Sequence, residues 1–391
     1  MYINIHNLRG ETHFCGQYHF LQLLSESMIG IVMSKLLKQK LAALFITAYR
    51  LTGFRVKKYQ QPSDISDLKN IAIFSTTALG DFLLNTPAIA AIRKRYPDAN
   101  ITMVVHQRNA MLVEGSDMFS NILYWDGKLN GVLKLVKALR RHHLDAVFLL
   151  HSRAPYDIIS ATLANSDIII KDVYYNDYLG LPTFYLNPYL SVPGHKRIDD
   201  VHLIHKKAEL LQSIGIILPS VEMMIPIEFL PEKKHRKTVG IHPGASSEER
   251  CWPIESFAIV ATQIMINFPD IDIELLGGPG EIERNNQLIQ LLLPFSQRVT
   301  NSAGKTNLKQ LVEKIASLQC LIVGDTGPLH VAIAVKTPTV VMFRGTKHAA
   351  GTRPLQDLAQ HKVLITEEGS GLSSIKPDDV LKGVYEIIST H

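Results

Sequence analysis

The chain has 391 residues, of which 46% are hydrophobic and 20% are charged, and its formal net charge is +5. This length exceeds one compact core and suits two domains, and the composition is that of a globular protein. The small basic excess suits an anionic ligand or an anionic membrane surface. It is too weak to indicate nucleic-acid binding, and no nucleic-acid-binding motif accompanies it.

Cysteine usage and hydropathy indicate the cellular compartment in which the chain is expected. The three cysteines, Cys15, Cys251 and Cys320, form no Cys-x-x-Cys pair, so we expect neither a disulfide framework nor a zinc site. A reducing compartment fits this usage. No apolar run is long enough to span a membrane, and polar residues interrupt the first 26 positions, so no secretory signal is predicted. We therefore expect a cytoplasmic location, either free or peripheral on the inner face of the inner membrane.

The first segment, 1–69, is predicted to be an N-terminal extension that contains a basic amphipathic helix at about Met33–Phe54. Apolar residues recur there at helical spacing, with basic residues between them: Leu36, Leu37, Leu41, Leu44, Phe45 and Tyr49, and Lys35, Lys38, Lys40 and Arg50. Such a helix lies on an anionic leaflet or packs on the surface of a domain, and the sequence favours neither alternative. The following Gln60–Asn70 has the composition of a linker.

Two series of alternating strands and helices follow the linker. The first has strands at Ile71–Ser75, Ile101–Val105 and Ala146–Leu150 and helices at Asp81–Tyr96 and Leu129–His142. The second has strands at Thr238–His242, Ile271–Leu276, Cys320–Val323 and Pro338–Phe343 and helices at Ile254–Ile266, Ile282–Leu292, Leu308–Leu318 and from Pro328. This alternation predicts parallel sheets with ligands at the carboxyl ends of the strands.

The predicted domains are 70–225 and 235–375, joined through the charged, proline-containing stretch Pro219–Lys237. A C-terminal helix, 376–391, can cross back to the first domain.

The first motif, Thr77-Ala78-Leu79-Gly80-Asp81, directly follows a predicted strand. Gly80 permits a sharp turn into a helix, and Asp81 stands at the helix start, where the charged form of a carboxylate is favoured. Asp81 is therefore either an ordinary helix cap or a catalytic base.

The second motif, His242-Pro243-Gly244-Ala245-Ser246-Ser247, follows the first strand of the second series. A loop rich in glycine and serine exposes backbone N–H groups that can hold phosphate, and Arg250 adds a charge with bidentate reach. The alternative is a plain turn with a solvated arginine. The position favours binding, with His242, Gly244, Ser246 and Arg250 as candidate residues.

The third motif, Leu276-Gly277-Gly278-Pro279-Gly280-Glu281, also follows a strand and opens a helix. Gly278 allows a ligand to approach closely, and Glu281 can accept hydrogen bonds from ribose hydroxyls. The motif differs from the G-x-G-x-x-G pattern, which argues against an NAD enzyme. We interpret the nearby Asn301–Asn307 as a strand-to-helix loop beside a nucleotide base, capped by Thr306 or Asn307.

The fourth motif, Val323-Gly324-Asp325-Thr326-Gly327-Pro328-Leu329-His330, carries the most information. A strand ends at Val323 and a helix begins near Pro328, because proline is well tolerated in the first helical turn. The N–H groups of Thr326, Gly327 and Leu329 are then expected to point from the helix start toward an anion, with a diphosphate as the natural candidate.

These motifs in this order, with Ala-x-x-x-x-Thr-Pro after the fourth, resemble glycosyltransferase family 9, the ADP-heptose:lipopolysaccharide heptosyltransferases. The resemblance extends from about Asn70 to Pro354 and leaves 1–69 outside it. It implies an α/β fold of GT-B type, with two Rossmann-like domains whose parallel sheets face a central cleft. The first domain would bind the acceptor and the second the donor. An inverting reaction that needs no metal and no cofactor is also implied.

The resemblance implies roles for individual residues. Asp81 resembles the general base of the family, and Glu281 resembles its ribose-binding carboxylate. Asp325, Thr326, Gly327 and His330 correspond to the turn around the diphosphate. Arg250 is the second implied catalytic residue, which would stabilise the charge of the leaving diphosphate. The family usually has a lysine at this position, so the charge is kept with a different geometry. Four basic residues of the first domain are candidates for binding the acceptor: His151, Arg153, Lys196 and Arg197.

The implied reaction moves a heptose from ADP-heptose to a lipopolysaccharide core acceptor. The implied partners are therefore a nucleotide sugar, a lipid-anchored saccharide and the inner membrane surface, and no nucleic acid. Three alternatives stand beside this reading: a transferase of O-antigen or capsule synthesis that uses another nucleotide sugar, a non-catalytic glycan-binding homologue, and a sugar-nucleotide epimerase. A panel of nucleotide sugars separates the transferases, and conversion of donor without acceptor marks an epimerase.

Overall fold

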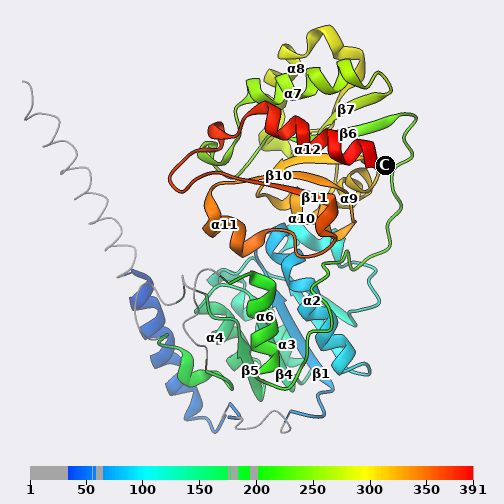
Figure 1. The fold of residues 1–391 in the computed structure, drawn as a ribbon. Helices are drawn as coiled ribbons and strands as arrows, with labels where there is room; N and C mark the ends of the chain where they lie inside the picture. Colours follow the sequence, from blue (N-terminus) through cyan, green and yellow to red (C-terminus); the bar gives the residue numbers. More distant parts are fainter. Residues whose placement is uncertain are drawn as a thin grey trace, which may run out of the picture.

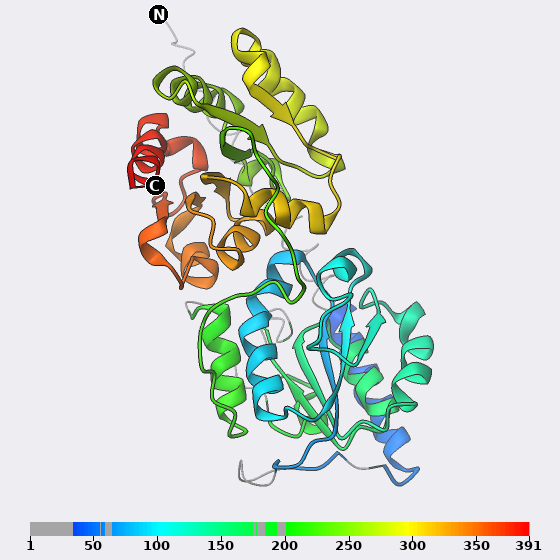
Figure 2. The same cartoon turned by 90° about the vertical axis from the view of Figure 1, so that its right-hand side faces the viewer.

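The computed structural model describes residues 34–54, 56–58, 65–174, 177, 184–193 and 201–390. Two parallel sheets with helices on both faces make up the two halves of the molecule (Figure 1). Figure 2 shows the segment after the first half running along one side of the molecule to reach the second half. The predicted α/β class with two Rossmann-like sheets is confirmed.

The first sheet has five strands in the order β3-β2-β1-β4-β5, and all its pairs are parallel. Its strands are β1 (Asn70–Ser75), β2 (Asn100–Val105), β3 (Asn121–Tyr124), β4 (Ala146–His151) and β5 (Ile168–Lys171). Successive residues of β1 enter opposite apolar clusters: Ile71 and Ile73 enter one, and Ala72 and Phe74 the other. Both faces are therefore buried, as is usual for parallel sheets.

Helices cover both faces of this sheet. The helices α2 (Leu79–Arg95) and α6 (Leu203–Gln212) pack on the side of Ile71 and Ile73. The helices α3 (Val132–Arg140) and α4 (Tyr156–Leu163) pack on the opposite side.

The second sheet has six parallel strands in the order β11-β10-β9-β6-β7-β8. They are β6 (Lys237–His242), β7 (Ile271–Leu275), β8 (Val299–Asn301), β9 (Cys320–Gly324), β10 (Thr339–Phe343) and β11 (His361–Ile365). One face carries α7 (Ile254–Asn267), α8 (Ile282–Leu291) and α12 (Pro377–Thr390). The other carries α9 (Leu308–Ala316) and α10 (Gly327–Ala334), and α11 (Gly345–Thr352) follows β10.

Short 3₁₀ helices complete the connections. They are η2 (Gln107–Leu112), η3 (Leu129–Gly131), η4 (Asn187–Tyr189), η5 (Glu248–Arg250), η6 (Pro279–Glu281), η7 (Leu293–Arg298), η8 (Leu358–Gln360) and η9 (Leu372–Ser374).

In each sheet the strand order reverses next to the first strand. β1 lies between β2 and β4, and β6 lies between β7 and β9. Open α/β sheets bind their ligands beyond the carboxyl ends of the strands at this switch point. The four strands concerned end at Ser75, His151, His242 and Gly324. The fold therefore directs attention to the loops that follow these four residues.

The two halves share one apolar cluster. Phe82 and Leu83 of α2 belong to the same cluster as Leu329 and Val331 of α10. Polar contacts add to this interface: the Met223 N–H donates to Gln356 Oε1 at 2.7 Å, and His202 Nε2 lies 3.0 Å from the Arg353 carbonyl oxygen. The helices that follow the switch-point strands β1 and β9 therefore pack directly on each other.

Most predicted elements are confirmed to within a few residues, but two predictions need correction. Asp81 is the third residue of α2, which begins at Leu79, and not the cap. The prediction that the last helix can cross back to the first domain is wrong, because α12 packs on α7, β9, β10 and β11. Its apolar residues Val380, Val384 and Ile387 join the core of the second sheet. The short strands β3, β5, β8 and β11 were not predicted, and the predicted domain limits stay a prediction.

The N-terminal segment forms a helix over 34–50. Ala42 and Ile46 are buried in the same apolar cluster as Phe74, so one side of this helix packs against the first half. No helix in the described part of the chain combines the length and the apolar character that crossing a membrane requires.

We expect the free energy of unfolding to decrease as the pH falls from about 6.5 to about 4. His361 is buried at the start of β11, with Nδ1 2.9 Å from Thr339 Oγ1, and burial lowers the pKa of His361 from 6.5 to about 4. Above pH 6.5 the histidine is neutral in the folded and in the unfolded chain, so the lowered pKa does not change the free energy of unfolding. Between pH 6.5 and about 4 only the unfolded chain binds the proton, which favours unfolding.

Urea unfolding measured near neutral pH and near pH 4 tests this expectation. His361→Gln should flatten the pH dependence by up to about 3 kcal/mol, while His235→Gln, at an exposed position, should leave it unchanged. An equally steep dependence in His361→Gln would contradict the argument.

Candidate active site

Asp81 lies beyond the carboxyl end of β1, in the first turn of α2. Its Oδ2 accepts a hydrogen bond from the Ala78 N–H at 3.2 Å and lies 3.5 Å from His151 Nε2. The side chain remains 28% exposed. Asp81 is therefore anchored by the helix start and still within reach of a ligand.

His151 ends β4, next to β1, and its ring is largely buried. Burial lowers the pKa of His151 to about 4 although the charge of Asp81 opposes this, so the imidazole is neutral near pH 7. The ring packs against Tyr174, with the two ring centroids 4.3 Å apart. A neutral imidazole with its proton on Nε2 can donate to Asp81 and leave the carboxylate ionised.

Buried ion pairs lie near His151. Lys171 lies 2.7 Å from Asp157 and 3.6 Å from Asp177, and Lys207 lies 2.8 Å from Asp172. The Tyr174 hydroxyl accepts from Lys207 Nζ at 2.9 Å and donates to the Leu150 carbonyl oxygen. Breaking such buried pairs is costly, so Tyr174 and the His151 ring that packs against it are held in place.

His242, at the end of β6, joins the second, third and fourth motifs. Its Nδ1 lies 3.4 Å from Thr326 Oγ1, and its Nε2 lies 3.7 Å from Glu281 Oε1. Burial lowers the pKa of His242, and Glu281 opposes that shift. Glu281 also accepts a hydrogen bond from the Gly278 N–H. The three loops therefore form one polar surface.

Gly244 permits the close approach of Glu281. A Cβ atom on Gly244 would lie 2.4 Å from Glu281 Cγ and 2.7 Å from its Oε1, so the glutamate would have to move away from Gly278 and His242. A Cβ on Gly280, in the same loop, would meet nothing within 4 Å.

Gly244→Ala is therefore expected to weaken nucleotide-sugar binding about tenfold, the effect of losing roughly one well-placed hydrogen bond. Isothermal titration with the donor measures this, and Gly280→Ala is the matched control. Equal affinities for the two variants would argue against a role for Glu281 in binding.

Arg250 and Asp325 connect η5 to the end of β9. Arg250 donates through one terminal nitrogen to Asp325 Oδ2 at 2.9 Å and to the Asp325 carbonyl oxygen at 2.7 Å. Its other terminal nitrogen donates to Ser246 Oγ at 3.0 Å, and Thr352 Oγ1 donates to Asp325 Oδ1 at 3.1 Å. The guanidinium is thus held across the second and fourth motifs.

The start of α10 corrects one detail of the predicted anion site. Thr326 is the cap residue, and the Leu329 N–H donates to the Thr326 carbonyl oxygen at 3.1 Å. The Leu329 amide therefore closes the first turn and does not point toward a ligand. The Thr326 and Gly327 N–H groups are left as donors at the helix start.

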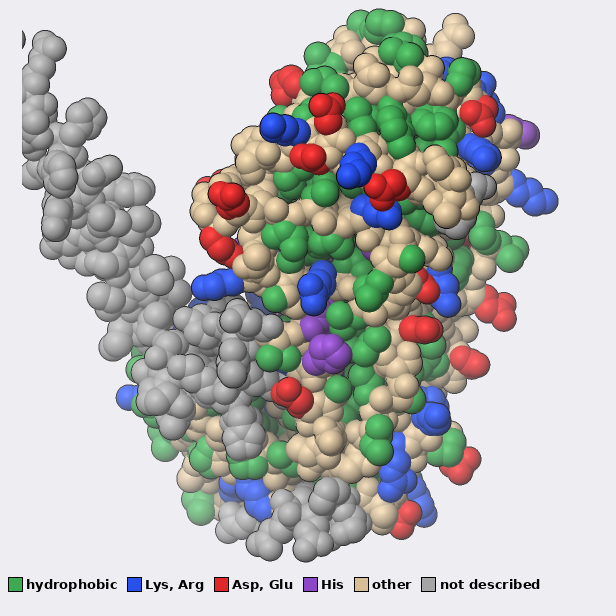
Figure 3. All heavy atoms as spheres, in the orientation of Figure 1, with side chains coloured by type: hydrophobic (Ala, Val, Ile, Leu, Met, Phe, Trp, Pro, Cys, Tyr) green, Lys and Arg blue, Asp and Glu red, His purple; other side chains and the backbone are tan. Residues whose placement is uncertain are grey.

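The starts of α2 and α10 meet between the halves. A Cβ atom on Gly80 would lie 2.6 Å from His330 Cδ2, and one on Gly327 would lie 3.1 Å from Leu79 Cδ2. Burial lowers the pKa of His330, while Asp325 and Asp81 both raise it. Asp81 and the fourth motif are therefore neighbours. On the face drawn in Figure 3, histidine side chains are visible at the level where the halves meet.

Several buried polar atoms surround the loop between β1 and α2 without a hydrogen-bond partner in the described part of the chain. They are Thr76 Oγ1, Thr77 Oγ1, Asn109 Oδ1, His151 Nδ1 and His330 Nδ1. Buried polar atoms are usually paired in folded proteins, so this group departs from the usual pattern next to Asp81.

Two small cavities accompany the second half of the site. One of about 160 Å³ is lined by His242, Gly277, Gly278, Thr306, Asn307, Leu308, Leu311 and Pro328. The other, of about 150 Å³, is lined by Ser247, Glu249, Arg250, Asp325, Met342, Arg344, His348 and Leu372. Asn307 caps α9 by accepting from the Gln310 N–H at 2.9 Å, which confirms the predicted cap.

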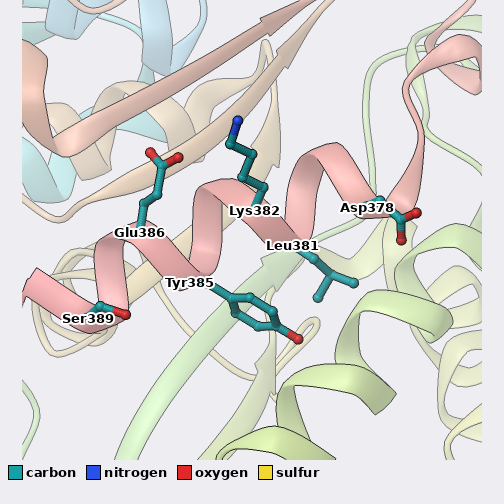
Figure 4. Close-up of a pocket in the computed structure, with 6 residues that line it drawn as sticks. All are labelled: Asp378, Leu381, Lys382, Tyr385, Glu386 and Ser389. Atoms are coloured by element: carbon teal, nitrogen blue, oxygen red, sulfur yellow. The ribbon is translucent and has the colours of Figure 1, made fainter.

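A wider hollow lies on the outside of α12 and is not part of this site. Figure 4 shows that its lining side chains all come from this one helix, and they are Asp378, Leu381, Lys382, Tyr385, Glu386 and Ser389. None of the motif residues reaches it.

The predicted acceptor contacts are only partly placed. His151 lies beside Asp81, and Arg153 is exposed two residues beyond β4. Lys196 and Arg197 lie outside the described residues. Sequence reasoning missed a mainly basic group near His106: burial lowers the pKa of His106 most, Arg108, Lys128 and Arg153 lower it further, and Asp126 raises it. Asp126 Oδ2 lies 3.6 Å from Lys128 Nζ. The three basic residues follow β2, β3 and β4, so the strand-end rule identifies them.

Two parallel sheets of Rossmann order, with site residues at the carboxyl ends of both, define a GT-B type fold. A family model described as glycosyltransferase family 9 (heptosyltransferase) matches residues 177–376, which is more than half of the chain. The chain belongs to this family and is a glycosyltransferase.

Individual proteins and solved structures are similar to this chain over most of its length. Lipopolysaccharide heptosyltransferase 1 of Campylobacter coli is 24% identical over 81% of this chain and 98% of its own length. The structure of E. coli ADP-heptose lps heptosyltransferase II matches with a TM-score of 0.67 at 20% identity, over 82% of this chain and 99% of that one. E. coli heptosyltransferase WaaC with ADP-2-deoxy-2-fluoro heptose matches with a TM-score of 0.61 at 18% identity, over 81% and 99%.

Proposed function

We propose that this glycosyltransferase moves a heptose from ADP-heptose to a lipopolysaccharide core acceptor, with inversion at the anomeric carbon. The observation that carries the proposal is the contact between Gly80 and His330, which brings Asp81 next to the turn at Thr326. The names of the relatives support heptose as the sugar, and one related structure holds an ADP-heptose analogue.

The second half, 235–375, is proposed to bind the donor. Glu281, fixed by the Gly278 N–H and near His242, would accept hydrogen bonds from the ribose hydroxyls. The cavity beside Asn307 would hold the base. The Thr326 and Gly327 amides, with Arg250 and Ser246, would hold the diphosphate.

The first half, 70–225, is proposed to supply the base and to bind the acceptor. Asp81 would remove the proton of the acceptor hydroxyl while that oxygen forms a bond to the anomeric carbon. The bond from this carbon to the diphosphate oxygen breaks, and ADP leaves with its charge stabilised by Arg250 and the helix start. Neutral His151 would orient Asp81 through Nε2.

The acceptor is proposed to carry negative charge. Arg108, Lys128 and Arg153 all act on His106 beyond β2, β3 and β4, together with the single carboxylate of Asp126, and phosphorylated or carboxylated sugars would meet this positive excess. A lipid-anchored acceptor places the reaction at the cytoplasmic face of the inner membrane.

The test is turnover of the purified chain with ADP-heptose and a core acceptor that lacks heptose. We expect the acceptor mass to rise by one heptose, activity to persist in chelator, and the new linkage to show inversion by NMR. Efficient transfer only from UDP- or GDP-sugars would identify the O-antigen or capsule alternative. Donor binding without transfer would indicate a glycan-binding homologue, and donor conversion without acceptor would indicate an epimerase.

A further inference from the structure

The helix over 34–50 has two apolar faces. One contains Ala42 and Ile46, which are buried against the first half. The other consists of Leu37, Leu41, Leu44 and Phe45, which are 57%, 56%, 68% and 47% exposed. Spacings of three and four residues bring these four side chains onto one side of the helix, and we refer to them as the outer stripe.

Single exposed leucines are ordinary on protein surfaces, but a contiguous apolar stripe on one helix is not. A surface helix with one partner needs one apolar face, which Ala42 and Ile46 already provide here. The outer stripe therefore indicates a second binding partner for this helix.

Charge identifies the chemistry of that partner. Lys38 directly follows Leu37 and Lys40 directly precedes Leu41, so at about 100° per residue they border the outer stripe on its two sides. Both lysines are exposed, and Lys40 Nζ lies 5.6 Å above the ring of the half-exposed Tyr185. The sequence from 34 to 58 contains basic residues and no acidic one: Lys35, Lys38, Lys40, Arg50, Arg55, Lys57 and Lys58.

We infer that the outer stripe binds the surface of an anionic lipid bilayer. The helix lies parallel to the bilayer, with the three leucines and Phe45 in the boundary between headgroups and acyl chains. Lys38 and Lys40 extend to the lipid phosphates on either side. The structure shows the packing alternative on one face of the helix, and this inference assigns the leaflet alternative to the other face.

The position of the helix suits this role. In Figure 1 the helix (dark blue) lies along the outside of the first half and away from the second half. Docking through the outer stripe would leave the second half in water, where it can take up a soluble donor. This inference concerns lipid binding alone and does not rest on the proposed reaction.

Co-sedimentation of the purified full chain with lipid vesicles tests the inference. We expect binding to vesicles of phosphatidylglycerol mixed with phosphatidylcholine, weaker binding to phosphatidylcholine alone, and a decrease at raised salt. Leu41→Glu/Leu44→Glu should weaken binding about tenfold or more. The matched control Ile217→Glu/Leu230→Glu, at positions 80% and 79% exposed, should bind like the original chain.

Lys38→Gln/Lys40→Gln keeps the apolar stripe and should weaken binding to the anionic vesicles roughly thirtyfold, since each lysine contributes about 1 kcal/mol. No binding by the original chain, or an equal loss in the control, would overturn the inference. So would a dimer in light scattering that Leu41→Glu/Leu44→Glu disperses, or vesicle binding seen only after removal of 1–33. Transfer to an acceptor without acyl chains should be unaffected by Leu41→Glu/Leu44→Glu.

Discussion

Asp81→Asn is expected to lower kcat by about a hundred- to ten-thousandfold, the usual contribution of a positioned general base. The asparagine side chain keeps the size of the carboxylate and can still accept the hydrogen bond from the Ala78 N–H, so α2 should start as before. It cannot take the proton of the acceptor hydroxyl. The affinity for the donor should therefore change little.

Steady-state rates with saturating donor, together with donor titration, measure these two effects separately. Asp98→Asn, at an exposed position in the turn that follows α2, serves as the control and should retain full activity. A normal kcat in Asp81→Asn would exclude Asp81 as the base. A normal kcat accompanied by a loss of donor affinity would instead make it a binding residue.

Arg250→Ala is expected to lower kcat by about a hundred- to a thousandfold, as is typical when one stabiliser of a developing negative charge is removed. Arg250 donates to the Asp325 carboxylate, the Asp325 carbonyl oxygen and Ser246 Oγ, and these bonds hold the guanidinium in place without a ligand. Arg250→Lys retains the charge but loses the forked geometry, so a decrease of only about tenfold is expected.

Single-turnover rates with bound donor report on this charge stabilisation directly. Arg95→Ala, an exposed arginine at the end of α2, is the control. Thermal unfolding of each variant shows whether the loss of the Asp325 partner affects the fold. Equal activity in Arg250→Ala and Arg250→Lys would show that charge at this position does not assist departure of the diphosphate.

Much of the fold can be predicted from the sequence because parallel strands are buried on both faces. The apolar runs at Ile71–Ser75 and Cys320–Val323 therefore stand out, and the loops after them contain Asp81 and Asp325. Parallel strands share one carboxyl edge, so the sequence predicted that the four motifs, which each follow a strand, lie at the carboxyl edges of the two sheets. The structure has them there.

The remaining details depend on which strands are neighbours. The contact between Asp81 and His151 exists because β4 pairs with β1, although 70 residues separate the two side chains. The buried pairs of Lys171 and Lys207 likewise depend on β5 and α6 packing near the end of β4. The Leu329 N–H points into the helix because it donates to the Thr326 carbonyl oxygen in the first turn of α10. Sequence composition does not reveal this hydrogen bond.

The two helix starts that meet at Gly80 and Gly327 have an electrostatic consequence. Aligned peptide dipoles place about half a positive charge at the N-terminus of a helix. Since the first turns of α2 and α10 lie in contact, two partial positive charges lie close together. No side-chain substitution removes this field. Variants that lack Arg250 should accordingly retain a residual attraction for anions, which weakens as ionic strength rises.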